Sequence, residues 1–206
     1  VEGDILMDGT SLLTLSPDKI ARSGISRTFQ NIRLFPKMSV AENIAIGFHC
    51  TPMYSRLEAL LGLPSVRRAE KEVQRKTAEM LEIFGLTEYA GMRAGNLGYG
   101  LQRKLEIARA LATSPKLLLL DEPAAGMNND ECVELAKLLR DVQKRFQVTI
   151  IIIEHHIDLV FDLCSRICVL NLGKVLKIDI PQNIQSDEKV IQSYLGSRME
   201  KNDEQQ

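Results

Sequence analysis

Two unbroken apolar runs constrain this sequence more than any other feature. They are "KLLLLDEP" at 116–123 and "VTIIIIEHH" at 148–156, and each ends in acidic or imidazole residues. A strand with one solvent-exposed face alternates apolar and polar residues. An unbroken run of apolar residues is typical of a strand of a parallel sheet that is buried on both faces. The stretch 128–146 between the runs has a helical pattern. The sequence therefore predicts an α/β fold with a parallel core sheet containing two buried strands.

Short strands and turns are predicted outside this core. The run at 1–9 is typical of a strand that enters a tight Asp-Gly turn. Ser16 and Pro17 predict the start of a short helix that stops at Gly24, and the β-prone run "ISRTFQ" follows it. The run at 167–179 predicts a hairpin that turns at its Leu-Gly pair.

The region from 37 to 86 is helical in character and predicts an insertion into the α/β core. Ser39 and Glu42 have the spacing of a capping box, and "TPMYSRLEALLGLPS" predicts a loop with a helical turn. The run 65–86 predicts a long surface helix with one buried stripe. Its stripe is Val66, Ala69, Val73, Thr77, Met80, Leu81 and Phe84, and the helix predicted at 101–113 has the stripe Leu101, Leu105, Ala108 and Ala112.

Composition narrows the class of protein. The net charge of −1 gives no electrostatic footprint for nucleic acid, so no nucleic-acid partner is expected. The longest apolar runs are far shorter than the ~20 residues of a membrane span. The four cysteines form no C-x-x-C pair. Cys164 and Cys168 lie one helical turn apart and could suit a metal, but buried reduced thiols in a reducing compartment are the preferred interpretation.

The ends of the predicted strands carry the candidate site. Asp121 ends one buried strand, where open α/β sheets bind ligands, and a carboxylate there can hold Mg²⁺. Glu122 could polarise an attacking water as a general base. His155 follows the other strand, so Asp121, Glu122 and His155 would converge at one edge of the sheet if the two strands are neighbours. Gln30 ends "RTFQ". The alternative is that Asp121 and Glu122 only end their strand and that His155 has no chemical role, while Gln30 alone indicates almost nothing.

The stretch "NLGYGLQRKLEIARAL" at 96–111 places two glycines directly before a strong helix. Unpaired N–H groups and the helix dipole favour an anion at such an N-terminus. A plain turn is the alternative interpretation.

Four motifs, taken together, resemble those of a known family. "RTFQ", "NLGYGLQRKLEIARAL", "LLLLDEPAAGMNND" and "IIIIEHH" follow the order of the Q-loop, signature, Walker B/D-loop and H-loop of ABC transporter ATPases. Within that family, "RTFQNIRLFPKMSVAENI", "SVRRAEKEV", "DEPAAGMN" and "VIQSYLG" resemble the branched-chain amino-acid importer ATPases of the LivG type. The resemblance implies a P-loop NTPase fold with a parallel core sheet, antiparallel N-terminal strands and a helical subdomain.

The resemblance also implies roles for the residues at the strand ends. Asp121 would bind Mg²⁺, Glu122 would be the catalytic base, and His155 would contact the γ-phosphate of ATP. Gln30 would sense the metal and the attacking water and would couple to the membrane subunit.

Two further motifs would face a second subunit. Gly98, Tyr99 and Gly100 of the signature would close over ATP held by the other ATPase subunit. The D-loop, with Gly126 and Asn128, would face the opposite protomer.

The implied partners are membrane permease subunits, a second ATPase subunit in a homo- or heterodimer, and indirectly a solute-binding protein. The resemblance implies a peripheral subunit at the cytoplasmic face of the membrane. This subunit would hydrolyse ATP to energise amino-acid import. The expected domains are a partial ATPase domain at 1–196, with a helical subdomain at about 37–105, and a polar tail at 197–206.

The sequence departs from the family pattern in two places. It contains no G-x-x-x-x-G-K-[ST], so the first strand and the Walker A loop are expected to be missing from an N-terminally truncated chain. Gly98 stands where the family usually has serine, and Leu101 where it has glutamine. A degenerate, non-hydrolysing subunit that only contacts a partner is therefore an alternative, and a DNA-repair relative is a further one, disfavoured by the short helical insertion and the lack of a basic face.

Overall fold

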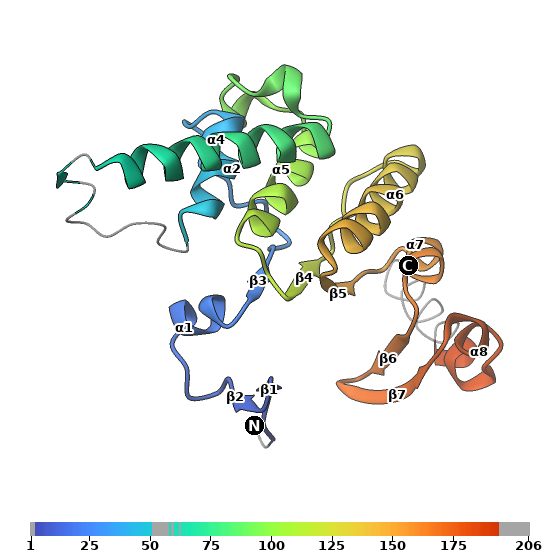
Figure 1. Ribbon diagram of the computed structural model, residues 1–206. Helices are drawn as coiled ribbons and strands as arrows, with labels where there is room; N and C mark the ends of the chain where they lie inside the picture. Colours follow the sequence, from blue (N-terminus) through green and yellow to red (C-terminus); the bar gives the residue numbers. More distant parts are fainter. Residues whose placement is uncertain (1–2, 51–57, 59, 62, 194–206) are drawn as a thin grey trace. The chain divides into compact units, whose positions relative to one another are not determined.

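The computed structural model describes residues 3–50, 58, 60–61 and 63–193. The chain divides into two compact units, residues 1–154 and 155–206 (Figure 1). Most of the loop predicted at 51–65, the end of "VIQSYLG" and the predicted polar tail lie outside the described residues. Within the described part of the chain, no helix has the length and apolar character needed to cross a membrane.

A parallel sheet forms the centre of the first unit and confirms the predicted α/β class. Its strands are β3 (Ile25–Arg27), β4 (Leu117–Asp121) and β5 (Thr149–Ile153), in the order β3-β4-β5. β4 is parallel to both neighbours, so the two apolar runs lie side by side in a parallel sheet. The carboxyl ends of all three strands therefore meet at one edge of the sheet.

The two predicted buried strands differ in burial. In β4, Leu118 and Leu120 are fully buried. In β5, Ile151 is 53% and Ile153 is 56% exposed, so the prediction that this strand is buried on both faces is wrong. The described residues cover only one face of β5, and a run of isoleucines has the same pattern whichever face is covered.

The N-terminal turns form as predicted. β1 (Leu6–Met7) and β2 (Thr10–Ser11) pair antiparallel around Asp8 and Gly9, which both have positive φ, as a tight hairpin turn requires. The helix α1 (Pro17–Arg22) follows, and Gly24 takes a φ of 96° after it. Ser16 occupies the cap position, but its hydroxyl donates to Asp18 Oδ1 at 2.6 Å instead of accepting from the helix backbone.

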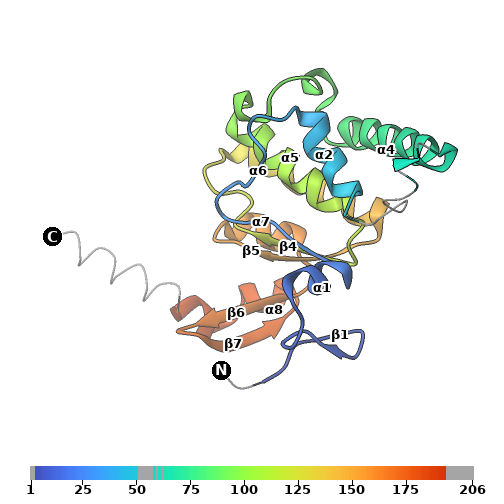
Figure 2. The ribbon, with the colours of Figure 1, turned by 90° about the vertical axis from the view of Figure 1, so that its left-hand side faces the viewer.

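Three helices of the first unit pack side by side (Figures 1 and 2). They are α2 (Val40–Phe48), α4 (Pro64–Ile83) and α5 (Tyr99–Ala112), with short 3₁₀ turns η1 (Thr87–Tyr89) and η2 (Ala94–Asn96) between α4 and α5. The predicted Ser39–Glu42 capping box starts α2. The predicted α4 stripe is confirmed, since Val73, Thr77, Met80, Leu81 and Phe84 are buried and Val66 and Ala69 are half-buried.

Gly47 sets the close approach of α2 to α5. A Cβ at this position would lie 2.5 Å from the Arg109 carbonyl oxygen and 2.6 Å from the Ala112 Cβ. Only glycine leaves room for the backbones at this distance.

The helix α6 (Asn129–Phe146) connects β4 to β5. Asn128 and Glu131 cap its start in a reciprocal capping box. Its buried stripe is Cys132, Leu135, Ala136, Leu139 and Val142, and the chain leaves the helix at Gln147, which has a φ of 50°.

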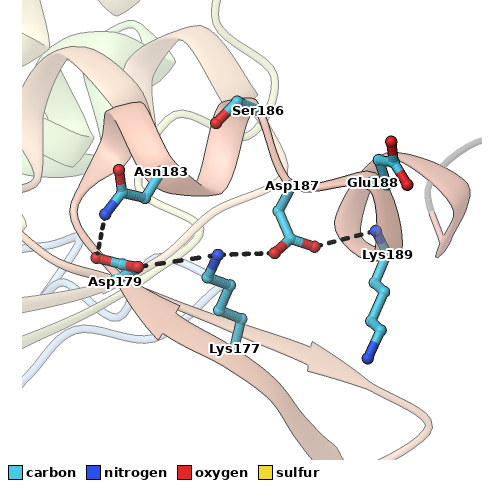
Figure 3. Close-up of a pocket in the computed structure, with 7 residues that line it drawn as sticks. All are labelled: Lys177, Asp179, Asn183, Ser186, Asp187, Glu188 and Lys189. Carbon is cyan, nitrogen blue, oxygen red and sulfur yellow. Dashed lines mark hydrogen bonds and ion pairs between the residues drawn. The ribbon is translucent and has the colours of Figure 1, made fainter.

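The second unit consists of α7 (Ile157–Leu163), the antiparallel strands β6 (Ile167–Asn171) and β7 (Lys174–Asp179), and α8 (Pro181–Gln185). The predicted hairpin turns at Leu172 and Gly173. Lys177 lies between Asp179 and Asp187 (Figure 3), with its Nζ 2.7 Å from Asp187 Oδ2. This hydrogen bond is the main cause that raises the pKa of Lys177.

The cysteines only partly match their expected burial. All four are free thiols; Cys132 is buried, Cys164 is half-buried, and Cys50 and Cys168 are exposed. The expectation of buried thiols is therefore wrong for Cys50 and Cys168. Desolvation raises the pKa of the Cys132 and Cys164 thiols. Among the residues described, no three His, Cys, Asp or Glu side chains form a group that could hold a metal.

Candidate functional site

The candidate site begins with a contact between two strand ends. Gln30 follows β3, and its Nε2 donates to Glu122 Oε2 at 2.8 Å, although 92 positions separate the two residues. The Thr28 N–H donates to the Leu119 carbonyl and extends the pairing of β3 with β4. The sheet thus brings an amide and a carboxylate together at its edge.

Asp121, the last residue of β4, has a positively charged partner. Arg27 Nη2 donates to Asp121 Oδ2 at 2.8 Å, and the two side chains are 54% and 25% exposed. Sequence reasoning did not single out Arg27. The parallel register of β3 against β4 places Arg27 near Asp121, and a paired register is difficult to derive from sequence alone.

The backbone after β4 has an unusual conformation. Glu122 has a φ of 45°, in the left-handed region that residues other than glycine rarely adopt. Its N–H donates to the Ile153 carbonyl at 2.8 Å, which ties the turn to the end of β5. Such strain persists only where neighbouring contacts enforce it, and it clusters at functional sites.

Glu154 holds the next turn and was also missed. Its Oε1 accepts the Ala124 N–H at 2.7 Å, in the stretch predicted as a D-loop. The sequence signal for Glu154 is a carboxylate directly after the β5 run, next to His155, which was the predicted site residue.

The stretches around Gly98 and Gly126 lie against each other. Gly98 is the N-cap residue of α5, and the N–H groups of the first helical turn have no partner within the helix. A Cβ on Gly126 would lie 3.6 Å from the Tyr99 ring, and one on Gly100 would lie 3.4 Å from Glu131 Oε1. The Asn128 side chain accepts the Glu131 N–H at 3.0 Å and so has a capping role.

The other predicted site residue, His155, lies in the second unit and is exposed. Its predicted approach to Asp121 and Glu122 stays a prediction.

A buried ion pair beside Gln30 is the main feature that sequence reasoning missed. Arg103 and Glu106, both on α5, are 0% and 2% exposed. Arg103 Nη2 donates to the Gln30 carbonyl at 2.8 Å, so this pair contacts the backbone of the candidate site. The signal was an Arg-x-x-Glu spacing in a helix with apolar residues on more than one side.

Two curated relatives resemble most of the chain. The high-affinity branched-chain amino acid transport ATP-binding protein BraF of Pseudomonas aeruginosa is 42% identical over 194 residues, which are 94% of this chain and 76% of BraF. The corresponding protein LivG of Escherichia coli is 43% identical, with the same coverage of both chains.

A solved structure shows the same fold. The crystal structure of the ADP conformation of MJ1267, an ATP-binding cassette of an ABC transporter, has a TM-score of 0.76 and 30% sequence identity. It covers 95% of this chain, and this chain covers 77% of it.

The sequence model of the family described as "ABC transporter" matches residues 1–125, more than half of the chain. This match agrees with the identity to BraF and LivG and with the fold of MJ1267. The chain belongs to the family of ABC transporter ATP-binding proteins.

Proposed function

We propose that this chain is an ATP-binding subunit of an importer for branched-chain amino acids, and that ATP hydrolysis at the Gln30–Glu122 edge drives the import. The names of BraF and LivG support the substrate class. The main structural support for placing hydrolysis at this edge is the 2.8 Å hydrogen bond between Gln30 and Glu122.

Glu122 acts as the general base in this proposal. A carboxylate that accepts a proton from water must lie within hydrogen-bond reach of that water, and its position is fixed here by the left-handed backbone and the bond to Ile153. The Gln30 amide, which contacts the same carboxylate, orients the water.

Asp121 and Gln30 are the proposed magnesium ligands. Carboxylate and amide oxygens are the hard ligands that Mg²⁺ prefers, and two protein ligands suffice because substrate phosphates and waters complete its shell. Bound Mg²⁺ would neutralise charge on the phosphates. The carboxylate of Asp121 is already paired with the Arg27 guanidinium, so this strand end accommodates a positive charge.

ATP is the proposed nucleotide, and two loops would contact it across a dimer. Gly98, Tyr99 and Gly100 present the α5 N-terminus, which favours an anion, to a phosphate held by a second ATPase subunit. Gly126 and Asn128 face that subunit.

The remaining assignments rest on the family. His155 contacts the γ-phosphate. Permease subunits, a second ATPase subunit and, indirectly, a solute-binding protein are the partners, and the chain lies at the cytoplasmic face of the membrane. The ATPase domain spans 1–196 with a helical subdomain at about 37–105 and a polar tail at 197–206. The packing of α2, α4 and α5 against one another supports the helical subdomain.

Because this sequence lacks the Walker A motif, the test uses the whole gene product that contains it. It measures uptake of labelled leucine by bacteria that lack their own LivG-type subunit and produce that protein. We expect uptake with the unmodified protein, a loss of at least about 100-fold with Glu122→Gln, and no change with Glu134→Gln, an exposed acid on α6. Protein levels are matched by immunoblot.

Two outcomes contradict the proposal. Equal uptake with Glu122→Gln removes the assignment of the base. Absence of uptake with the unmodified protein contradicts the import function and favours a non-hydrolysing subunit, the alternative raised by the missing Walker A motif and by Gly98 and Leu101.

A further inference from the structure

Helix α5 contacts one loop through three charged side chains. Arg103, Glu106 and Arg109 recur at three-residue intervals, so they lie on neighbouring turns of one side of the helix. All three bond to the backbone of residues 29–33, which we name the Gln30 segment. The segment has no helix or strand of its own.

Arg103 holds the start of the Gln30 segment. Its Nη1 donates to the Phe29 carbonyl and its Nη2 to the Gln30 carbonyl, both at 2.8 Å. Nη2 also donates to the Tyr99 hydroxyl at 3.1 Å. The planar fork of guanidinium suits this work, because it presents several donors in one fixed geometry.

Glu106 and Arg109 hold the end of the segment. Glu106 Oε1 accepts the Arg33 N–H at 3.0 Å, while Oε2 accepts from Arg103 Nη1 at 2.8 Å. Arg109 Nη2 donates to the Arg33 carbonyl, and its guanidinium lies 5.4 Å from the centre of the Phe35 ring. Burial lowers the pKa of Arg109, while the Glu106 carboxylate opposes that shift.

The fold alone does not account for a buried pair of this kind. Replacing a buried ion pair by apolar residues of similar size often leaves stability unchanged or raises it, because desolvation of the charges offsets their attraction. Here both charges are used to satisfy backbone groups of one irregular loop. The contacts are specific for the position of that loop.

We propose that Arg103 and Glu106 are positioning residues that hold the Gln30 side chain against Glu122. The backbone of Gln30 is held by Arg103, and its side chain reaches Glu122 at 2.8 Å. Because Arg103 also bonds Tyr99, the same pair links the Gln30 segment to the first turn of α5. A displacement of that turn is transmitted to the Gln30–Glu122 contact.

This inference rests on the proposed function for the meaning of the Gln30–Glu122 contact, but its test needs no nucleotide. The test compares ¹⁵N spectra and amide exchange of the full chain with those of the double variant Arg103→Met/Glu106→Leu. We expect the Gln30 side-chain amide signal to move toward that of free glutamine. We also expect the Arg33 amide to exchange about tenfold faster or more, with the urea midpoint of unfolding little changed.

The exposed pair Arg145→Met/Glu79→Leu is the matched control, and it leaves both signals unchanged. Unchanged Gln30 and Arg33 signals in a folded Arg103→Met/Glu106→Leu variant overturn the proposal. If that variant does not fold, Arg103→Lys replaces it, since one ammonium keeps the charge beside Glu106 but lacks the fork that serves both carbonyls. Failure of both to fold overturns the proposal as well, because the pair is then required for the fold itself. These spectra and exchange rates do not depend on transport, so they test the positioning role even if the leucine uptake experiment fails.

Discussion

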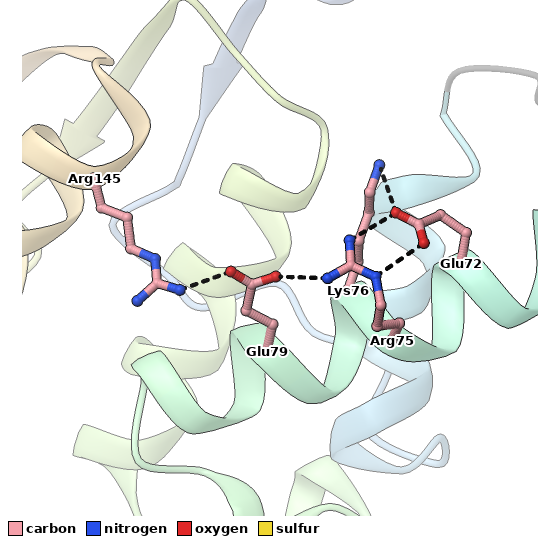
Figure 4. Close-up of polar contacts among 5 residues, drawn as sticks. All are labelled: Glu72, Arg75, Lys76, Glu79 and Arg145. Carbon is pink, nitrogen blue, oxygen red and sulfur yellow. Dashed lines mark hydrogen bonds and ion pairs between the residues drawn. The ribbon is translucent and has the colours of Figure 1, made fainter.

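The first unit contains two groups of charged side chains that differ in surroundings. Arg103 and Glu106 are buried on α5 and bond to the Gln30 segment. The other group runs along the outside of α4, where Arg75 lies between Glu72 and Glu79, and Glu79 reaches Arg145 of α6 at 2.7 Å (Figure 4). Its members are 37–62% exposed.

The difference lies in what each group would lose when broken. Water replaces the partner of an exposed charge, and salt screens the attraction, so such pairs contribute little. Water cannot reach Arg103 or Glu106, so the loss of one leaves the other charged and unpaired. The buried pair therefore fixes one geometry, whereas the exposed group tolerates several.

Breaking the buried pair on one side has the largest expected effect. Glu106→Leu leaves Arg103 buried without a counter-ion, and we expect the free energy of unfolding to fall by about 3–5 kcal/mol. Urea denaturation followed by circular dichroism measures it. A loss below about 1 kcal/mol would mean that water or another acid reaches Arg103.

Breaking the helix packing instead of the charges has a smaller expected effect. Gly47→Ala places a methyl group 2.5 Å from the Arg109 carbonyl oxygen, so α2 and α5 must move apart. We expect a loss of about 1–3 kcal/mol in the same denaturation experiment. Gly91→Ala is the control, because nothing lies within 4 Å of a Cβ there. Equal stability of the two variants would contradict the close packing.

Breaking the exposed pair tests the other side of the comparison. Arg145→Met removes the contact with Glu79, and we expect a loss below about 1 kcal/mol at low salt and none at 1 M salt. A loss as large as that of Glu106→Leu would show that exposure does not separate the two groups.

The effect of pH on the exposed group is the smallest. The hydrogen bond from Arg75 holds the pKa of Glu72 below its usual value of 4.5. Because the folded-state pKa is depressed, the stabilisation is present above 4.5 and is lost as the pH falls through the folded-state pKa. A ¹³C titration of the carboxyl group gives its midpoint, which we expect to rise toward 4.5 in 1 M salt. A midpoint at 4.5 in low salt would show that Arg75 does not hold the carboxylate.

Sequence patterns predicted the sheet and its edge well. The two apolar runs form neighbouring parallel strands, and the polar residues after β3 and β4 lie together, as the Gln30–Glu122 contact shows. These features depend on local pattern and on the rule that parallel strands end at one edge.

The buried charges could not be predicted in the same way. A stripe of Leu101, Leu105 and Ala108 assigns Arg103 and Glu106 to a solvated side of the helix, but α2, α4 and the Gln30 segment surround α5. Burial on several sides is a property of the assembled helices. The exposed face of β5 was missed because its isoleucines have the same pattern on both faces.

One measurement tests most directly whether the buried charges serve the proposed site. Leucine uptake is compared between Arg103→Met/Glu106→Leu and Arg145→Met/Glu79→Leu, at matched protein levels. If the buried pair positions Gln30, leucine uptake falls by about 10- to 100-fold in the first variant and is unchanged in the second. Equal uptake by the two variants would contradict the account.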